Sequence, residues 1–409
     1  MSKTIAIVAS LDSKSREVAY ARDFVQRAGH KALVIDLSVR HKPSLTPDVS
    51  SSEVLAAIGV SWEEIQKNDK SKRIELMAQA ITAKLSALYE AGKFDGVFSM
   101  GGLQNTTMAT LGMQALPWGV PKVMLTTIAS GNRTFGPYVG TRDVMIMHSV
   151  GDISGINFLT ESVIGNALAA VIGMAEKSRG RLAKQDKNKT AIGATMMGIT
   201  GDGVVEAIRV LEDHGHDVIT FHTNGIGGRS MEEMIGMGML NAVLDMTIYE
   251  VTGELLGGFA VGAPGRLTAA AKAGIPQVIA PGSLDVVTWA TEKPGVVPPT
   301  CVDRKYQFFH NSTLVHNKVT QPEMVRIAEI IADRLNMGRG PVTFLVPLGG
   351  FNNQGGPGGK LFDRAIDETL VAILRQKCDK RVRIIETEYN INDAAFGQMA
   401  ANLLLEYLA

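Results

Sequence analysis

The chain alternates short apolar runs with amphipathic stretches, and one such pattern occurs twice at an offset of 186 residues. Residues 4–36 and 190–222 each begin with an apolar run that fits a buried parallel strand, followed by a small, polar loop, an amphipathic helix, a Gly-His turn and a second apolar run. The two helices share an apolar face, formed by Val18, Ala21, Phe24, Val25 and Ala28 and then by Val204, Ala207, Ile208 and Leu211. The pattern predicts two α/β domains with mainly parallel sheets, each with strand-end loops suited to binding a ligand.

The same pattern continues through both halves of the chain. In the first domain, residues 1–185, it predicts helices over 72–91 and 158–176 and strands over 94–100 and 122–127. In the second domain, residues 186–409, it predicts strands over 242–245, 276–280, 342–347 and 382–386. Asn392 and Asp393 are candidate caps for a closing helix through Leu408, which could pack on the second domain or cross back to the first. Residues 177–189 hold six Lys or Arg and one acid, which favours a solvated linker over a nucleic-acid or phosphate patch.

Composition narrows the class of protein without naming an activity. The 41 basic and 41 acidic residues cancel, so no overall field favours nucleic acid or an anionic membrane. The two cysteines, Cys301 and Cys378, lack CxxC spacing and signal neither a disulfide framework nor a zinc site. The N-terminus lacks the pattern of a secretory signal, and no run approaches the ~20 apolar residues of a membrane span. We therefore expect a cytoplasmic protein without a membrane partner.

The first candidate site is the glycine pair that follows the predicted strand 94–100. The segment supplies glycines, amide and hydroxyl side chains and the free N–H groups of a helix start, through Gly101, Gly102, Gln104, Asn105, Thr106 and Thr107. It matches neither GxxxxGK[ST] nor GxGxxG. The residues suit a phosphate or carboxylate, and the alternative is a tight structural turn with a threonine cap.

Two further strand ends in the first domain carry small or polar residues. Ser10, Asp12 and Lys14 follow the first strand. The opposite charges of Asp12 and Lys14 could bind a ribose hydroxyl, a phosphate or a metal-bound phosphate. The alternative is a helix cap beside a solvated lysine. Ser130, Gly131 and Asn132 form a small-residue turn after the strand 122–127.

In the second domain, a glycine loop that ends in a cation follows the second βαβ unit. The candidate residues are His222, Gly225, Gly227, Gly228 and Arg229. Backbone N–H groups with Arg229 could clamp an anion, and His222 could act as a donor or a general base. The alternative is a glycine-rich turn without a ligand.

The remaining candidates are scattered through the second domain. They are Gly282, Asp285, His310 and Asn311, together with Asp245, Glu250, Glu254 and His316. No GxSxG motif surrounds a serine, so a hydrolase triad has little support. The HxxxxxH spacing of His310 and His316 is not diagnostic of a metal site, and we predict no resident metal.

Over nearly its whole length the chain resembles the Tm-1-like ATP-binding protein family. The resemblance rests on long motifs in order: Gly101-Gly102 with Thr106 and Ala109-Thr110, PKVMLTTIASGN at 121–132, PYVGTRDVMIMHSVGDISGIN at 137–157, FHTNGIGGRSMEEM at 221–234, VLDMTIYEV at 243–251, GIPQVIAPGSLDVV at 274–287, His310-Asn311 and GPVTFLVPLGG at 340–350. The resemblance implies two Rossmann-like domains, nucleotide binding and self-association. The chain departs from the family at Leu103-Gln104-Asn105, where glycines are usual, at Ser13, where threonine is usual, and near Lys318, where arginine is usual.

These observations lead to one functional hypothesis with an alternative. We expect the strand-end loops, in a cleft between or beside the domains, to bind ATP or a related phosphorylated small molecule, with magnesium as a companion ion. Whether the chain is an enzyme or a nucleotide-dependent binding protein stays open. If it is an enzyme, Asp12, Lys14, His222 and Asp285 are the candidates for its chemistry. The alternative is a hydrolase or lyase that acts on a small organic acid anion.

Overall fold

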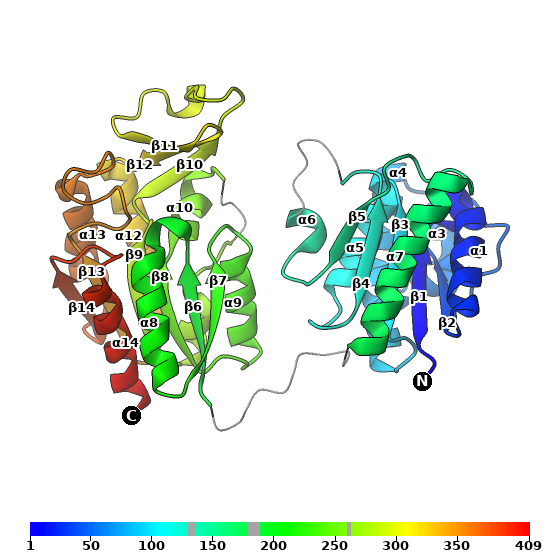
Figure 1. The fold of residues 1–409 in the computed structure, drawn as a ribbon, viewed down its shortest axis with the longest axis horizontal. Coiled ribbons are helices and arrows are strands. Elements are labelled where there is room, and N and C mark those ends of the chain that lie inside the picture. Colours follow the sequence, from blue (N-terminus) through cyan, green and yellow to red (C-terminus); the bar gives the residue numbers. More distant parts are fainter. Residues whose placement is uncertain (130–135, 179–188, 260–262) are drawn as a thin grey trace. The chain divides into compact units, whose positions relative to one another are not determined.

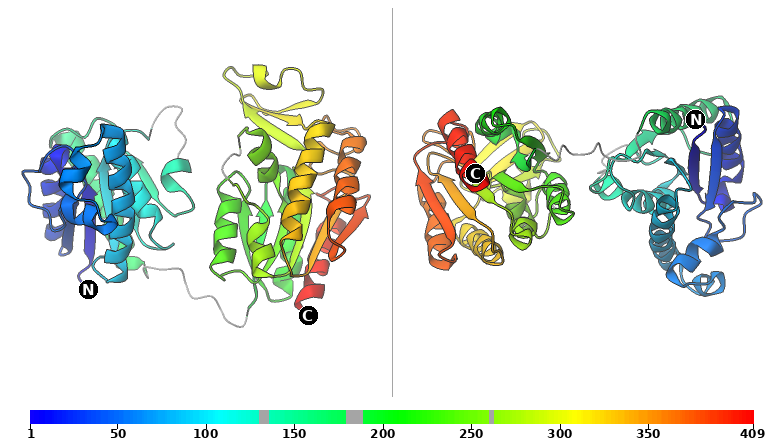
Figure 2. Two further views of the ribbon diagram at one scale, coloured as in Figure 1. Left: turned by 180° about the vertical axis from the view of Figure 1, so that it is seen from behind. Right: turned by 90° about the horizontal axis from the view of Figure 1, so that it is seen from below.

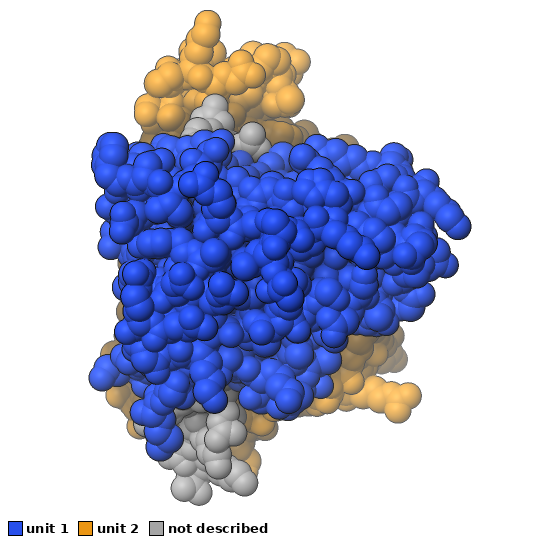
Figure 3. Space-filling model, turned by 90° about the vertical axis from the view of Figure 1, so that its right-hand side faces the viewer, with its two compact units in different colours: residues 1–184 blue, residues 185–409 orange. Residues whose placement is uncertain are grey.

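The computed structural model describes residues 1–129, 136–178, 189–259 and 263–409. Two compact units, residues 1–184 and 185–409, divide the chain (Figure 3). Each unit is built around a parallel sheet (Figure 1), so the predicted α/β class with two sheets is confirmed. The predicted turn Ser130, Gly131 and Asn132 and most of the predicted linker lie outside the described residues.

In the described part of unit 1, five parallel strands form one sheet in the order β2-β1-β3-β4-β5. The strands are β1 (Thr4–Ala9), β2 (Lys31–Asp36), β3 (Gly96–Gly101), β4 (Lys122–Thr126) and β5 (Met145–His148). Side chains alternate along each strand, so both faces of β1 carry apolar residues, and both must be covered.

Helices cover both faces of this sheet (Figure 2). Helices α1 (Leu11–Arg27) and α7 (Phe158–Lys177) pack against the face of Ile5 and Ile7. Helices α4 (Lys70–Glu90) and α5 (Leu103–Gln114) pack against the face of Ala6 and Val8. The shorter helices of this unit are α2 (Ser51–Leu55), the 3-10 turn η1 (Ala56–Ile58), α3 (Trp62–Gln66) and α6 (Gly136–Val139).

Helix α7 is long and apolar enough, by length and composition alone, to cross a membrane. Its buried residues, which include Val163, Ile164 and Ala167, belong to the core that contains β1, β3 and β4. The apolar composition of α7 is therefore what a helix needs to cover one face of a buried parallel sheet.

In the residues described for unit 2, six parallel strands form a sheet in the order β14-β13-β9-β8-β6-β7. The strands are β6 (Ala191–Met196), β7 (Asp217–His222), β8 (Ala242–Thr247), β9 (Gln277–Gly282), β13 (Val342–Pro347) and β14 (Val382–Thr387). A separate antiparallel sheet, which the sequence did not predict, has the order β10-β12-β11. Its strands are β10 (Val286–Ala290), β11 (Gln307–Asn311) and β12 (Leu314–Lys318).

The helices of unit 2 again cover both faces of its parallel sheet. Helices α8 (Gly201–Asp213) and α14 (Ala394–Leu408) share one core, and α12 (Gln321–Asn336) and α13 (Arg364–Lys377) share the other. The remaining elements are η2 (Gly198–Thr200), α9 (Gly227–Gly236), α10 (Tyr249–Leu256), α11 (Thr268–Ala273) and η3 (Pro299–Cys301). The closing helix α14 packs on α8, where a Cβ atom on Gly397 would lie 2.2 Å from the carbonyl oxygen of Gly203. Glycine at this crossing lets the two helices approach closely.

Candidate functional site

The strand order of unit 1 changes direction between β1 and β3. In a parallel sheet of this order, the crossover helices leave on opposite faces at that point, and a crevice opens at the carboxyl ends of the two strands. A pocket of about 320 Å³ lies there. It is lined by Ser10, Asp12, Ser13, Lys14, Arg40, Lys70, Gly101, Gly102, Leu103, Gln104, Asn105 and Asp152. We call it the switch-point pocket.

Asn105 joins the two loops that form this pocket. Its side-chain oxygen accepts hydrogen bonds from the backbone N–H of Ser10 at 2.9 Å and from the Ser10 hydroxyl at 3.2 Å. Its amide nitrogen donates to the Ser99 hydroxyl and to the Met100 carbonyl oxygen, both at 2.9 Å. These bonds show that Asn105 positions the loops, and its predicted role in ligand binding stays a prediction. The Thr106 hydroxyl also has a partner within the protein, because it forms a hydrogen bond with the Thr126 hydroxyl at 2.7 Å.

Asp12 brings a third loop to the pocket. Its carboxylate accepts the backbone N–H groups of Val39, at 3.3 Å, and Arg40, at 3.1 Å. The N–H of Asp12 in turn donates to the hydroxyl of Ser38 at 2.8 Å. These bonds fix the loop after β2 against the start of α1, and they place Arg40 at the pocket wall.

The pocket has the electrostatics of an anion site. Three cations, Lys14, Arg40 and Lys70, line it together with two carboxylates, Asp12 and Asp152. The Lys14 ammonium group donates to the carbonyl oxygen of Ile153, and within the described residues none of the three cations forms an ion pair. Helix α5 starts at the pocket with Gly102 as its N-cap and no side-chain cap. Its first N–H groups and the positive end of its dipole are therefore available to an anion.

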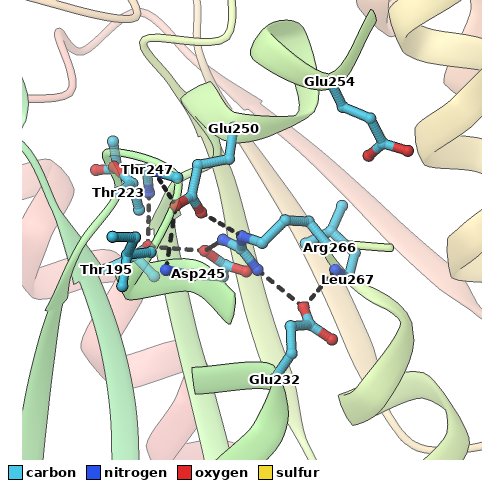
Figure 4. Close-up of polar contacts among 12 residues, drawn as sticks. Thr195, Thr223, Glu232, Asp245, Thr247, Glu250, Glu254, Arg266 and Leu267 are labelled. Atoms are coloured by element: carbon cyan, nitrogen blue, oxygen red, sulfur yellow. Dashed lines mark hydrogen bonds and ion pairs between the residues drawn. The ribbon is translucent and has the colours of Figure 1, made fainter. Parts of the chain in front are cut away.

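The strand order of unit 2 changes direction at the equivalent place, between β6 and β8. Here the side chain of Arg266 is fully buried, and it forms ion pairs with Glu250 at 2.7 Å, Asp245 at 2.8 Å and Glu232 at 2.9 Å (Figure 4). Asp245 also accepts the Thr195 hydroxyl at 2.7 Å, which ties the cluster to both strands. We call these four charged residues the Arg266 cluster.

Glu250 also binds the predicted glycine loop. Its carboxylate accepts the N–H of Gly225 at 2.7 Å and that of Gly228 at 3.1 Å. A Cβ atom on Gly228 would lie 1.7 Å from Glu250 Oε2, so any other residue there would displace side chains of the Arg266 cluster. The loop was predicted to offer these N–H groups to a ligand, but in the structure they bind the carboxylate of the protein itself. Gly227 is equally constrained, because its Cβ atom would lie 2.0 Å from the carbonyl oxygen of His222.

The Arg266 cluster disfavours an anion at this strand end. Burial by itself lowers the pKa of Arg266. The attraction of three carboxylates, Asp245, Glu250 and Glu232, is larger than this effect and holds the pKa well above its usual range. Three carboxylates thus surround one permanent cation, and the local charge is negative. His222 and Arg229, predicted to act with the glycine loop, are both exposed.

Asp285 belongs to a second buried ionic cluster in unit 2. The Lys318 ammonium group lies 2.8 Å from Asp285 and 2.6 Å from Asp367, and the Asn352 amide donates to Asp285 at 3.0 Å. Burial raises the pKa of Asp367 to about 8, Lys318 opposes this shift, and Asp285 adds to it. Lys318 therefore lies between two buried acidic side chains, of which Asp367 keeps its proton up to about pH 8.

The other predicted residues of unit 2 lie on or beside the antiparallel sheet. His310 and Asn311 are exposed on β11, and the Asn311 side chain accepts the N–H of Thr313 at 2.8 Å in the hairpin turn. His316 is buried, and its Nδ1 atom lies 2.7 Å from the Thr288 hydroxyl. A Cβ atom on Gly282 would lie 2.2 Å from the carbonyl oxygen of Met246.

Among contacts of the described residues, none joins His222 to Asp285 or His310. In the same residues, no group of three acidic, histidine or cysteine side chains suits a metal ion.

Sequence reasoning missed several residues of these sites. Arg40 and Lys70 line the switch-point pocket, and Arg266 and Glu232 complete the cluster at the end of β8. Arg40 could have been found, since the loop after β2 must lie beside the loop after β1 when these strands are neighbours. Lys70 lies in a basic run that reads as a solvated surface, and Arg266 is a single cation; only the tertiary structure brings them to the strand ends.

The fold and these two strand ends define a two-unit α/β protein with parallel sheets and a change of strand direction in each unit. The chain belongs to the uncharacterised protein family UPF0261: the N-terminal domain of that family matches residues 3–180, and its C-terminal domain matches residues 189–408. A UPF0261 protein of Clostridium tetani is 36% identical over 100% of both chains, and one of Rhizobium meliloti is 34% identical over 97% of both.

The resemblance to the Tm-1-like family is confirmed. The tomato mosaic virus resistance protein Tm-1(GCR237) of Solanum lycopersicum is 31% identical over 81% of this chain and 44% of its own length. Among solved structures, the Staphylococcus aureus MnaA–UDP co-structure has a TM-score of 0.22 at 11% identity, covering 68% of this chain and 79% of that one. Acinetobacter baumannii MurG has a TM-score of 0.23 at 11% identity, covering 99% of both chains.

Replacement of Arg266 tests the Arg266 cluster. We expect Arg266→Met to lower the free energy of unfolding of unit 2 by about 3–5 kcal/mol, because it leaves buried carboxylates without their cation. Arg209→Met is the control, since Arg209 pairs with Glu206 and Asp213 on the surface, where solvent screens the pairs, and its loss should be much smaller. Urea unfolding followed by hydrogen exchange of β6 and β8 measures both. Equal losses in the two variants would contradict this account.

The raised pKa of Asp367 predicts a pH dependence. The folded state keeps a proton that the unfolded state releases above pH 3.8, so the free energy of unfolding should fall as pH rises towards about 8. Burial lowers the pKa of His316 to about 4, so that group reduces stability only below pH 6.5. Between pH 6.5 and 8 we therefore expect the wild type to lose roughly 1 kcal/mol per pH unit.

The matched variant for this pH dependence is Asp367→Asn, which keeps an oxygen for Lys318 but has no proton to release. Urea unfolding at several pH values from 6.5 to 8 compares it with the wild type. The variant should lose less stability over this range. Parallel curves for the two proteins would show that Asp367 is ionised throughout.

Proposed function

We propose that unit 1 binds a phosphorylated small molecule, with ATP as the first candidate, in the switch-point pocket. The observation that supports this most directly is that the uncapped start of α5 and three cations, which form no ion pair among the described residues, converge on one pocket at a change of strand direction. A phosphate placed there would accept hydrogen bonds from the first N–H groups of α5, while Lys14, Arg40 and Lys70 neutralise its charge.

The two carboxylates in the pocket give magnesium a role in this proposal. Asp12 and Asp152 supply oxygen ligands of the kind that Mg²⁺ prefers, beside the cations that would hold a phosphate. Mg²⁺ usually binds through one or two carboxylates together with substrate phosphates. We therefore expect magnesium to strengthen the binding of a nucleotide more than the binding of inorganic phosphate.

A small organic acid anion is the alternative ligand, because the same cations and N–H groups would also bind a carboxylate. If the protein turns its ligand over, Lys14 would stabilise developing negative charge at this pocket, and Asp12 would be the base. Product analysis after incubation with ATP decides between an enzyme and a protein that only binds.

The variant Gly102→Asp tests the pocket. A Cβ atom on Gly102 would approach only the Thr127 hydroxyl, at 3.6 Å, and aspartate is a favourable N-cap, so the variant should fold. Its carboxylate would bind the N–H groups of α5 and repel an anion. Titration calorimetry with inorganic phosphate and with ATP, with and without magnesium, should show at least a tenfold loss of affinity for both ligands.

The matched control is Gly198→Asp, which places the same side chain in the loop after β6, where a Cβ atom meets nothing within 4 Å. We expect it to leave the affinity for phosphate and ATP unchanged. Equal losses in the two glycine variants, or full binding by Gly102→Asp, would overturn the proposed site. Binding of carboxylic acids in place of phosphates would support the alternative ligand class.

A further inference from the structure

A second recess in unit 1 lies between α4 and α5. It has a volume of about 610 Å³ and is lined by Ser71, Ile74, Glu75, Ala78, Gln79, Thr82, Thr107 and Leu111. The α4 residues fall at helical spacing along one face of that helix. Ile74, Ala78 and Leu111 supply apolar surface, and the polar side chains surround them. We call this recess the α4–α5 groove.

On both α4 and α5, residues that line the groove adjoin residues that line the switch-point pocket. On α4, Lys70 lines the pocket, and the next residue, Ser71, lines the groove. On α5, Leu103 lines the pocket, and Thr107, one turn further on, lines the groove. The Thr107 hydroxyl donates to the carbonyl oxygen of Leu103 at 3.0 Å, so these two lining residues are in direct contact.

The α5 wall carries two exposed leucines on one line of the helix. Leu103, Thr107 and Leu111 are spaced four residues apart and form a line along α5 away from the pocket. The side chains of Leu103 and Leu111 are 49% and 39% exposed, although apolar residues of α5 such as Met108 and Met113 are fully buried. Two exposed leucines in line with an anion pocket favour a ligand that has both an anionic and an apolar part.

We propose that the ligand of unit 1 is an amphipathic organic phosphate whose apolar group lies in the α4–α5 groove. This inference rests on the proposed anion site, because the switch-point pocket would hold the phosphate and so direct the ester group towards Thr107 and Leu111. The groove extends along α4 from Ser71 to Thr82, which is roughly 16 Å at about 1.5 Å per residue. It therefore suits an ester group that is extended.

The test compares inorganic phosphate with n-hexyl phosphate by titration calorimetry on the full chain. We expect n-hexyl phosphate to bind the wild type at least tenfold more tightly than phosphate, because its chain buries apolar surface. In Leu111→Glu this preference should fall to less than threefold, with the affinity for inorganic phosphate unchanged. The matched control is Val205→Glu, which replaces a 58% exposed residue on α8 in unit 2 and should keep the full preference.

The outcomes separate this inference from the proposed function. If both phosphates bind equally, or if Leu111→Glu keeps the preference, the groove is not a ligand site, while the anion pocket stands. If n-hexyl phosphate binds and needs Leu111, but inorganic phosphate does not bind and Gly102→Asp has no effect, the proposed anion site fails. If Leu111→Glu instead converts an oligomer to monomers in analytical ultracentrifugation, a second copy of the chain occupies the groove, and the inference is overturned.

Discussion

The change of strand direction in each parallel sheet is the constraint on which the rest of the structure depends. Between β1 and β3, and again between β6 and β8, the crossover helices leave on opposite faces of the sheet. The backbone groups at these strand ends must then find partners in side chains, water or a ligand. Asn105 accepts the N–H of Ser10 in unit 1, and the Thr195 hydroxyl accepts the N–H of Thr247 in unit 2.

Charged side chains lie at the strand ends of both units, but the balance of charge is opposite. In unit 2 a buried arginine and three carboxylates occupy the strand ends, and one of these carboxylates also binds the glycine loop. In unit 1 the corresponding loops leave a pocket in which cations outnumber carboxylates. Salt screens the buried Arg266 cluster only weakly, whereas Lys14, which is partly exposed, and Arg40 and Lys70, which are exposed, can bind an anion from solution. A repeated fold therefore does not imply a repeated ligand site.

The sequence predicted the fold well, because buried parallel strands and amphipathic helices are local patterns. The strand β13 (Val342–Pro347) and the two βαβ units were found in this way. The antiparallel sheet was missed, since its short strands carry polar residues such as His316 and Lys318 whose burial depends on distant partners. Among the candidate site residues, Asp12, Lys14 and Gly102 line one pocket, as neighbouring strand ends in one sheet should. The ligand role of the glycine loop stays a prediction: its sequence shows N–H groups but not the carboxylate of Glu250, more than twenty residues away, that accepts two of them.

The central claim is that the strand ends of unit 1 accept an anion and those of unit 2 do not. A crystal structure of the full chain grown with tungstate, a phosphate analogue with strong anomalous scattering, tests this most directly. The account predicts anomalous density at the start of α5, within reach of Lys14, Arg40 and Lys70, and none beside Arg266. Density between β6 and β8, with an empty switch-point pocket, would contradict it.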